Sequence, residues 1–471
     1  MKAGTLWAGI VMVIISGWTP AFTQSLFESS QSGDHENSVN SYSLGGFIRS
    51  VGYLGKTPAD QNHYFQSAYG QLGVQLDARA GDFATARVDL RFRYGTEFQE
   101  SVSQTDLREA YVDIKAGPAG FRFGKLITPW GKGTVFNPTD KITPIDPTIR
   151  SPEEDDRYLG TWAFQGMINM GSHMKLTTIY KPLYRSSVLL IDPVPMPGYV
   201  NFLDPGHPGM ELNEGSYGVN FDLYTGPIDL SLYWFEGYHH WPGIGFDSFS
   251  MDTITLEPVS LNLREQAYRI RMAGMDLSLP IGSWIFRAEG AWQQTVVSHT
   301  DHEYLPFPEL AYTAELERSG THYNLVGGYY GKYILDYTAP LAEPSLSAGN
   351  DQFQQMIQKG ILPDNETVNG MISERIGAFN RLYNYQLEEF YHQLFLVGKG
   401  FFWYDRIEIT VPLIYNLTTS EWTIQPGISY KPTDGLRISA GYSGFYGPGE
   451  SLYDLIGPVL NAGYLSVKLT F

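Results

Sequence analysis

Charged side chains recur at every second position in the stretch 87–93, where arginine and aspartate alternate with valine, leucine and phenylalanine. Alternate residues of an extended strand share a face, so this spacing gathers the charges on one side. A strip of fixed charge along a narrow passage orients polar solutes and discriminates between ions. The same test identifies these candidates for a pore lining: Arg87, Asp89, Arg91, Arg93, Glu109, Asp113, Arg269, Arg271, Arg287 and Glu289. The alternative is that the charges only hydrate a wall and pair with one another.

A second group of chemically capable residues lies in the long connection 129–157. Five prolines stiffen this connection, and an acidic run occupies 153–156. Folded inward, it would form a constriction; folded outward, it would be an external cap whose acidic run is solvated or bridges lipopolysaccharide through divalent cations. The constriction candidates are Trp130, Lys132, Asn137, Asp140, Asp146, Glu153, Glu154, Asp155 and Asp156.

Several other kinds of chemistry are not predicted. The chain has no cysteine, and its 32 basic and 50 acidic residues give a net charge of −18, which argues against a nucleic-acid partner. The pairs His239-His240 and His299-x-x-His302 lack the spacing of an established metal motif. We therefore expect no metal, no cofactor and no enzymatic activity.

The elements that must position the charged residues are strands, because apolar and polar residues alternate along most of the chain. Charged residues are only 17% and aromatic residues are 14% of the composition, which speaks against long soluble helices. The pattern predicts about eighteen strands, with sixteen as the lower count: 44–54, 65–79, 84–95, 105–116, 119–128, 158–170, 174–182, 215–224, 228–238, 264–279, 284–297, 309–318, 322–337, 385–398, 402–416, 420–431, 435–445 and 462–471.

Short and long connections alternate between these strands. Tight turns such as 80–83 and 432–435 follow one strand, and long connections such as 55–64, 96–104 and 183–214 follow the next. Short periplasmic turns and long extracellular loops are typical of an outer-membrane barrel. We therefore predict an all-β fold, a transmembrane antiparallel up-and-down β-barrel. In loop 338–384, a short helix is predicted that Asn350 or Asp351 caps and that Gly360 and Pro363 end.

The two ends of the chain agree with this interpretation. Lys2 followed by an apolar run to Trp18 predicts a signal peptide over 1–23, since the run is too short to span a membrane. A short periplasmic segment, 24–43, would precede the barrel, 44–471. The last strand alternates up to a terminal Phe471, which resembles the signature that the barrel-assembly machinery of Gram-negative bacteria recognises.

The segment FRFGKLITPWGKGTVFNPTDKITPIDP resembles a segment of porin-type barrels of Gram-negative bacteria. The residues that carry the resemblance are Gly124, Lys125, Trp130, Gly131, Asn137, Pro138, Asp140, Pro144 and Asp146. The resemblance implies passage of solutes through the outer membrane, in some members apolar ones, and it fixes no ligand.

The predicted function is a porin-like channel for passive or loop-gated diffusion of small solutes. Two alternatives stay open: a surface barrel with a blocked lumen that acts as an adhesin or receptor through its loops, and a channel for hydrophobic solutes. The expected surroundings are outer-membrane lipid and lipopolysaccharide, the barrel-assembly machinery during biogenesis, a small-molecule solute and, as a further option, a second copy of the chain in a homo-oligomer.

Overall fold

The computed structural model describes residues 40–57, 60–190, 196–206, 208–209, 211–252, 257–346 and 365–471. The predicted signal peptide and the helix predicted within loop 338–384, between 350 and 363, lie outside these residues. So does nearly all of the predicted periplasmic segment, of which only the last residues are described, as the beginning of a strand.

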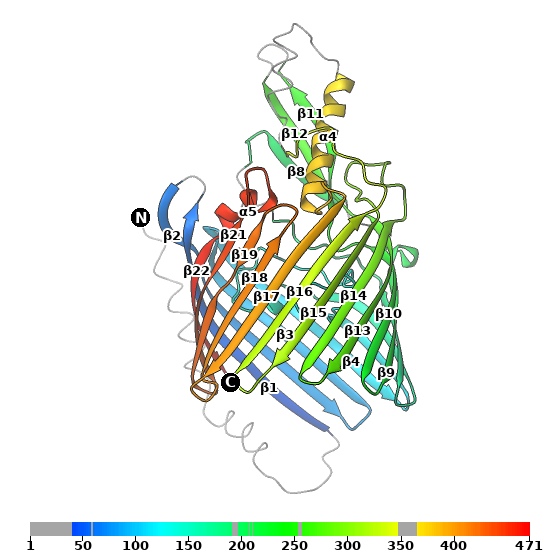
Figure 1. Cartoon of the computed structure of the whole chain (residues 1–471), viewed down its shortest axis with the longest axis vertical. Coiled ribbons are helices and arrows are strands. Elements are labelled where there is room, and N and C mark those ends of the chain that lie inside the picture. The colour runs from blue at the N-terminus through cyan, green and yellow to red at the C-terminus, as the bar shows by residue number, and fades with distance from the viewer. Residues whose placement is uncertain are drawn as a thin grey trace, which may run out of the picture. The chain divides into compact units, whose positions relative to one another are not determined.

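The described chain forms a closed antiparallel barrel (Figure 1). Each strand pairs with the next one in the wall, and β1 pairs with β22 through nine residue pairs from Phe47↔Thr470 to Gly55↔Ala462, which closes the sheet on itself. The barrel strands are β1 (Asn40–Thr57), β2 (Asp60–Ala80), β3 (Ala84–Glu97), β4 (Glu100–Ala116), β5 (Ala119–Leu126), β6 (Thr161–Met170), β7 (Met174–Lys181), β9 (Ser216–Thr225), β10 (Ile228–Tyr238), β13 (Arg269–Ile281), β14 (Trp284–Thr295), β15 (Glu309–Ser319), β16 (Tyr323–Ile334), β17 (Phe390–Phe402), β18 (Ile407–Asn416), β19 (Trp422–Ile424), β20 (Gly427–Thr433), β21 (Leu436–Tyr446) and β22 (Ala462–Thr470).

The predicted fold class is confirmed. β19 and β20 both pair with β18 and with β21, so they fill one position and the barrel has 18 strands. The interruption falls at Gln425 and Pro426, where proline has no N–H to donate to the ladder.

Three predicted connections differ from the structure. The predicted long loops 55–64 and 96–104 are largely strand. In the first, β1 extends to Thr57 and β2 begins at Asp60; in the second, only Phe98 and Gln99 separate β3 from β4. Both of these residues have positive φ, which makes the reversal tight. The predicted turn at 399–401 is also misplaced, because the chain reverses at 403–405, where three consecutive residues have positive φ.

The outer face of the barrel is apolar. Ile48, Phe92, Trp234 and Leu396 are each between 39% and 53% exposed, whereas residues one position away, such as Arg49 at 1% and Phe235 at 1%, are buried. Alternation between a lipid-facing and an inward-facing side therefore holds around the wall, as bacterial barrels require.

A small folded module extends from the end of the barrel that carries the long loops (Figure 1). It combines β8 (Val200–Gly206), β11 (Gly243–Met251) and β12 (Pro258–Gln266), which form a separate sheet, with helix α4 (Asn365–Tyr383). Leu261, Leu263, Ile372 and Ile376 are at the centre of its apolar core. We call these four elements the cap; sequence reasoning treated them as loops.

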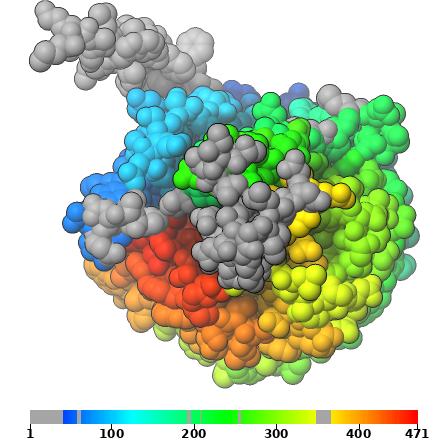
Figure 2. All heavy atoms as spheres, turned by 90° about the horizontal axis from the view of Figure 1, so that it is seen from above, coloured from blue at the N-terminus to red at the C-terminus, as the bar shows by residue number. Residues whose placement is uncertain are grey.

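Helix α5 (Leu452–Leu460) lies beside the cap in the β21–β22 loop, where its Leu455 packs against the cap core. Viewed from above, α4 and α5 both lie at the mouth of the barrel (Figure 2). Two short 3-10 helices, η1 (Glu154–Arg157) and η2 (Leu212–Glu214), complete the described elements. Among the described residues, no helix is long and apolar enough to cross a membrane.

Candidate functional site

The connection between β5 and β6, residues 127–160, lies inside the barrel. Its side chains contact inward-facing residues of strands on opposite sides of the wall, including Arg49 of β1 and Glu289 of β14. We call this connection the β5–β6 loop. Since Glu289 and Glu315 lie near the middle of their strands, the loop reaches well into the lumen.

The first anchor of the loop is the carboxylate of Glu289. It accepts hydrogen bonds from the backbone N–H groups of Lys132 at 3.0 Å, Gly133 at 3.2 Å and Thr139 at 2.8 Å. The Thr139 hydroxyl donates to it as well, at 2.7 Å. The neighbouring carboxylate of Glu315 accepts from the N–H of Thr134 at 3.0 Å and from its hydroxyl. Two buried glutamates thus satisfy backbone donors that would otherwise lie unpaired in the interior.

Gly131 allows this approach. Its φ is +92°, and a Cβ atom there would lie 2.6 Å from both carboxylate oxygens of Glu289. Only glycine combines the left-handed backbone with the space that the carboxylate needs. The Trp-Gly pair in the sequence therefore positions the loop on Glu289.

Two aromatic side chains of the loop fill one side of the lumen. Trp130 packs on Tyr233, with ring centroids 5.1 Å apart, and meets Phe235 edge-on. Phe136 stacks on Tyr330 at 4.5 Å. Ile270, Met272 and Leu126 join the Trp130 cluster. Apolar side chains thus face inward on this side, because the loop covers them and excludes water.

Two lysines of the loop pair with acids of the wall on the same side. The Lys132 ammonium lies 2.8 Å from Asp276 and 2.9 Å from the Ser231 hydroxyl. Lys141 lies 3.9 Å from Glu309, which also pairs with Lys332 at 2.9 Å. The carbonyl of Asn137 accepts from the N–H of Asp140 at 3.1 Å, so Asn137 shapes the turn.

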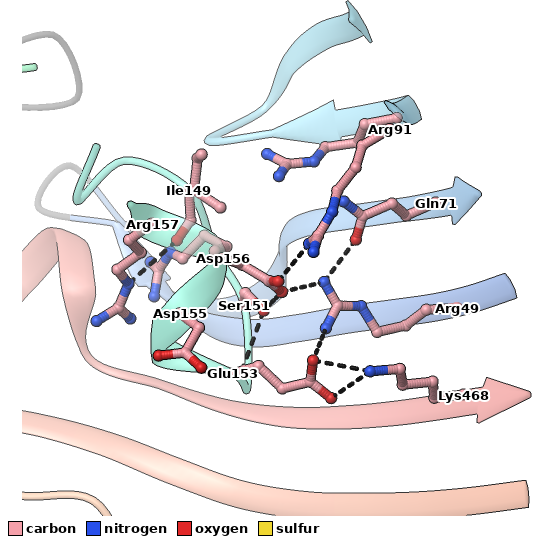
Figure 3. A network of polar contacts seen from close by, with 12 residues as sticks. Arg49, Gln71, Arg91, Ile149, Ser151, Glu153, Asp155, Asp156, Arg157 and Lys468 are labelled. Carbon is pink, nitrogen blue, oxygen red and sulfur yellow. Dashed lines mark hydrogen bonds and ion pairs between the residues drawn. The ribbon is translucent and has the colours of Figure 1, made fainter. Parts of the chain in front are cut away.

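The second anchor holds the far end of the loop to the opposite wall (Figure 3). The carboxylate of Asp156 pairs with the guanidinium groups of Arg49 and Arg91 and accepts from the Ser151 hydroxyl. Glu153 accepts from Lys468 of β22 at 2.8 Å. Two of the four acids in the run therefore face the wall, while Glu154 and Asp155 are exposed.

An aromatic ring supports the cations of this anchor. The charged groups of Arg49, Arg91 and Lys468 lie 5.4, 5.2 and 4.5 Å from the centre of the Phe47 ring, within the range of cation–π attraction. Burial by itself would raise the pKa of Asp156, but Arg49 and Arg91 hold it well below its usual range. Asp156 is therefore a carboxylate at any ordinary pH.

A third contact joins the loop to the β21–β22 loop. Arg150 donates to the carbonyls of Val459 at 2.7 Å and Leu460 at 2.8 Å, at the C-terminal end of α5, and to the Gln66 side chain at 2.8 Å. A cation is favourable at the end of a helix where carbonyl groups lie unpaired. Burial lowers the pKa of Arg150 to about 10, so it stays charged at neutral pH.

Asp140 and Asp146 shape the loop by local hydrogen bonds. Asp140 accepts from the N–H of Thr143 at 3.2 Å, and Asp146 accepts from the N–H of Thr148 at 2.9 Å. Burial raises the pKa of Asp140 to about 6, even though hydrogen bonds from Thr143 lower it. Asp140 thus changes its charge in a mildly acidic medium.

This raised pKa gives a pH dependence of known sign. Since the folded pKa of Asp140 lies above its ordinary value of 3.8, the folded state holds the proton more tightly. Its contribution to the free energy of unfolding therefore falls as pH rises from 4 to 6, by about 3 kcal/mol. We expect Asp140→Asn to remove this decline when urea midpoints are compared in detergent between pH 4 and pH 7. An unchanged pH profile in the variant would contradict the assignment.

The structure places most of the pore-lining candidates on the inward face. Arg87 lies 3.5 Å from Asp77, Arg93 pairs with Glu97 at 3.0 Å, and Asp113 pairs with Arg122 at 2.6 Å. The other inward candidates are Asp89, Arg91, Glu109, Arg287 and Glu289. Among them, Glu109 accepts from the N–H of Ile127 in the β5–β6 loop at 3.1 Å, and Arg287 pairs with Glu315 and Glu317.

The prediction that Arg269 and Arg271 face the lumen is wrong. Their neighbours Ile270 and Met272 are 0% exposed and belong to the inner cluster, and Met275, on the arginine side, is 50% exposed. Arg271 pairs with Glu236 at 3.1 Å and Arg269 lies over the Tyr238 ring at 5.0 Å, so both are on the outer face near the long loops. The prediction assigns the polar face of each strand to a water-filled lumen. The β5–β6 loop makes this part of the interior apolar, so here the apolar face of β13 points inward.

Arg108 is an inward-facing residue that strict alternation missed. The register of β3 and β4 shifts between Asp89↔Glu109 and Leu90↔Leu107, which leaves Arg108 as the extra residue of a bulge. A bulge re-aims side chains, so Arg108 lies 3.7 Å from Asp89 and donates to the carbonyl of Asp155. No sequence signal marks the bulge. Sequence reasoning also missed Arg49 and Lys468, which anchor the loop. Lys468 lies on a polar face of its strand, but Arg49 shares its face with Phe47, Val51 and Tyr53, so alternation does not single it out.

The histidine pairs do not form a metal site in the described part of the chain, where no group of three His, Cys, Asp or Glu residues is suitably arranged. His239 and His240 stack at 4.9 Å and are buried. Burial lowers the pKa of His239 to about 3, so the pair is neutral and serves packing.

Terminal Phe471 lies at the seam of the barrel. Its backbone N–H and carbonyl each bond to Gly46 of β1 at 3.0 Å, and its side chain is 59% exposed. The last residue thus continues the pairing that closes the wall.

A closed antiparallel barrel with an apolar outer belt and a polar, loop-filled interior defines an outer-membrane β-barrel of the porin type. The chain belongs to the family described as "Protein of unknown function (DUF1302)", whose model matches residues 26–361. No curated protein matches the chain.

Several solved structures share the fold at low sequence identity. OccK2 (OpdF) of Pseudomonas aeruginosa, solved in complex with glucuronate, has 10% identity and a TM-score of 0.50, over 93% of this chain and 99% of that chain. OccAB3 of Acinetobacter baumannii has 9% identity and a TM-score of 0.50, over 91% and 99%. The outer membrane protein OpdK of Pseudomonas aeruginosa has 7% identity and a TM-score of 0.50, over 92% and 98%. These similarities concern the fold.

Proposed function

We propose that the barrel is a channel for diffusion of small solutes, with the β5–β6 loop as its constriction. The observation that carries the proposal is that the loop fills one side of the lumen and leaves a cavity on the other side. The loop contacts β10 and β13–β17 on one side of the lumen. On the other side, a cavity of about 420 Å³ remains beside Arg91, Arg93 and Arg108. We call the inward face that bears Arg49, Arg87, Arg91, Arg93 and Arg108 the arginine wall.

Barrel width supports a water-filled passage. A barrel of 18 strands is too wide for its own side chains to fill, so it conducts unless loops block it. Here the loop fills the apolar side, and the side with fixed charges stays polar. Solutes would therefore pass along the arginine wall, where charge controls their access.

Single-channel recording of the refolded protein in planar bilayers tests this function. We expect discrete current steps in potassium chloride that persist without an energy source. Protein that inserts into the bilayer in a heat-modifiable, folded form but carries no current would reject the proposal.

Ion selectivity tests the path. We expect Arg87→Gln combined with Arg93→Gln to raise the permeability of potassium relative to chloride by roughly twofold or more, since two positive charges leave the arginine wall and neither side chain anchors the β5–β6 loop. The matched control is Arg269→Gln combined with Arg271→Gln, which removes the same charge from the outer face. Equal effects of the two double variants on the reversal potential would contradict the path.

The cap favours a second candidate function, a surface barrel that binds a partner through its loops. A folded module with its own apolar core is more than a channel mouth requires. This function predicts negligible current in the intact chain and loss of partner binding when the cap is removed. We also propose that the barrel contacts lipopolysaccharide on its outer rim, that the barrel-assembly machinery reads the strand ending at Phe471, and that the barrel self-associates through its outer face.

A further inference from the structure

The cavity beside the arginine wall has walls of two kinds. It lies in the half of the lumen nearer the long loops, between β2–β4, the far part of the β5–β6 loop and the segment that follows β7. Its lining residues are Gln71, Arg91, Arg93, Gln104, Asp106, Arg108, Asp146, Ile149, Asp156, Leu159, Tyr184, Arg185, Ser186 and Val188. At about 420 Å³ it has the size of a small-molecule site.

The acids of the lining are already satisfied by other groups. Asp156 pairs with Arg49 and Arg91, Asp106 lies 3.5 Å from Lys125, and Asp146 accepts from Thr148. None of them needs a ligand to balance its charge.

One of the four lining arginines differs from the rest. Arg91 and Arg93 are held in ion pairs, and Arg108 lies near Asp89. Arg185 donates to the carbonyl of Gly160 at 2.7 Å, and no acidic side chain within the described residues lies within ion-pair distance of it. Its guanidinium therefore offers donors to an anion, and guanidinium groups bind carboxylates with two parallel hydrogen bonds.

An apolar surface lies in the same cavity. Ile149 and Leu159 are 8% and 6% exposed, and Val188 comes from the same segment as Arg185. Sugars and small polar acids carry little apolar surface to place against aliphatic walls, whereas a ligand with an apolar body removes more of that surface from water.

We propose that this cavity binds amphiphilic monoanions, with the anionic head on Arg185 and the apolar body against Ile149, Leu159 and Val188. The proposal rests on the proposed channel function and names its solute class. A hydrophilic anion of the same charge lacks the apolar body, and an apolar cation lacks the anionic head. Neither can therefore use both surfaces of the cavity.

Three probes separate the two components of recognition: 2-naphthoate, glucuronate and 2-naphthylmethylammonium. Each is added to single channels in potassium chloride, and the concentration that halves the current is measured. We expect naphthoate to act at a concentration roughly tenfold or more below the other two, a difference that one charge pair or one buried ring system supplies. Glucuronate as effective as naphthoate would overturn the apolar component, and the cation as effective as naphthoate would overturn the anionic one.

Variants locate the binding residue. Arg185→Gln should raise the half-blocking concentration of naphthoate about tenfold, while Arg264→Gln, which removes an arginine paired with Asp247 in the cap, should leave it unchanged. Equal behaviour of the two variants would overturn the role of Arg185.

Failure of the proposed anion site can be distinguished from failure of the proposed channel function. If the native chain carries no current, the channel proposal fails, but equilibrium binding of naphthoate to the purified protein, followed by its fluorescence, still tests the cavity. Binding that Arg185→Gln weakens would support the site, and absence of binding by the native protein would overturn it.

Discussion

Replacing Asp156 by asparagine will release the far end of the β5–β6 loop from the wall. The Asp156 carboxylate is the buried partner of both Arg49 and Arg91, and Arg49 is 1% exposed. Removing one partner of a buried ion pair leaves the remaining charge uncompensated and costs about 3 to 5 kcal/mol. We therefore expect a large loss in the free energy of unfolding and, in folded channels, a larger and noisier current.

Asp155→Asn is the matched control, because it makes the same substitution one residue earlier on an exposed side chain. It should leave both the urea midpoint and the current close to native values. If Asp156→Asn behaves like this control in both measurements, the ion pairs do not hold the loop.

The second large effect is expected at Glu289, which holds the near end of the loop. Glu289→Ala would leave the N–H groups of Lys132, Gly133 and Thr139 without their acceptor. Each buried donor left unpaired costs about 1 to 3 kcal/mol. We expect residues 130–140 to become accessible to protease added to the folded protein, and the current to increase.

Glu317→Gln is the corresponding control on the same inner wall. Glu317 pairs with Arg287 at 2.6 Å and accepts from Asn324. Within the described chain it makes no hydrogen bond to the β5–β6 loop, so its substitution should leave the loop protected. If protease cleaves the loop no faster in Glu289→Ala than in Glu317→Gln, contacts other than those of Glu289 are sufficient to hold the loop in the lumen.

The sequence predicts the wall of this barrel well, because lipid on one side of each strand imposes a physical alternation that residue types record. The pattern of Leu465, Val467 and Leu469 reappears as outward, exposed side chains. The same reasoning placed Arg87, Asp89, Arg91 and Arg93 on the inner face. The predicted strands are too short where polar residues continue the ladder, as at β3 and β4, which extend to Glu97 and from Glu100.

The interior could be predicted only in part, since it depends on contacts between residues distant in the chain. Arg269 and Arg271 were misassigned because nothing local shows that Trp130 covers Ile270 and Met272. Arg108 was missed because a bulge of one residue leaves no mark in the sequence pattern. The partners of Asp156 could not be assigned either, as Arg49 is 107 residues away.

The most direct test of the central claim, that solutes pass along the arginine wall, uses the absence of native cysteine. A single cysteine at Gln104, which lines the cavity, is treated with a charged thiol reagent during single-channel recording. A cysteine at Gln294, which pairs with Arg271 on the outer face, serves as the comparison. The account predicts a stepwise fall in current after modification at Gln104 and none at Gln294; a current that is unchanged after complete modification at Gln104 would contradict it.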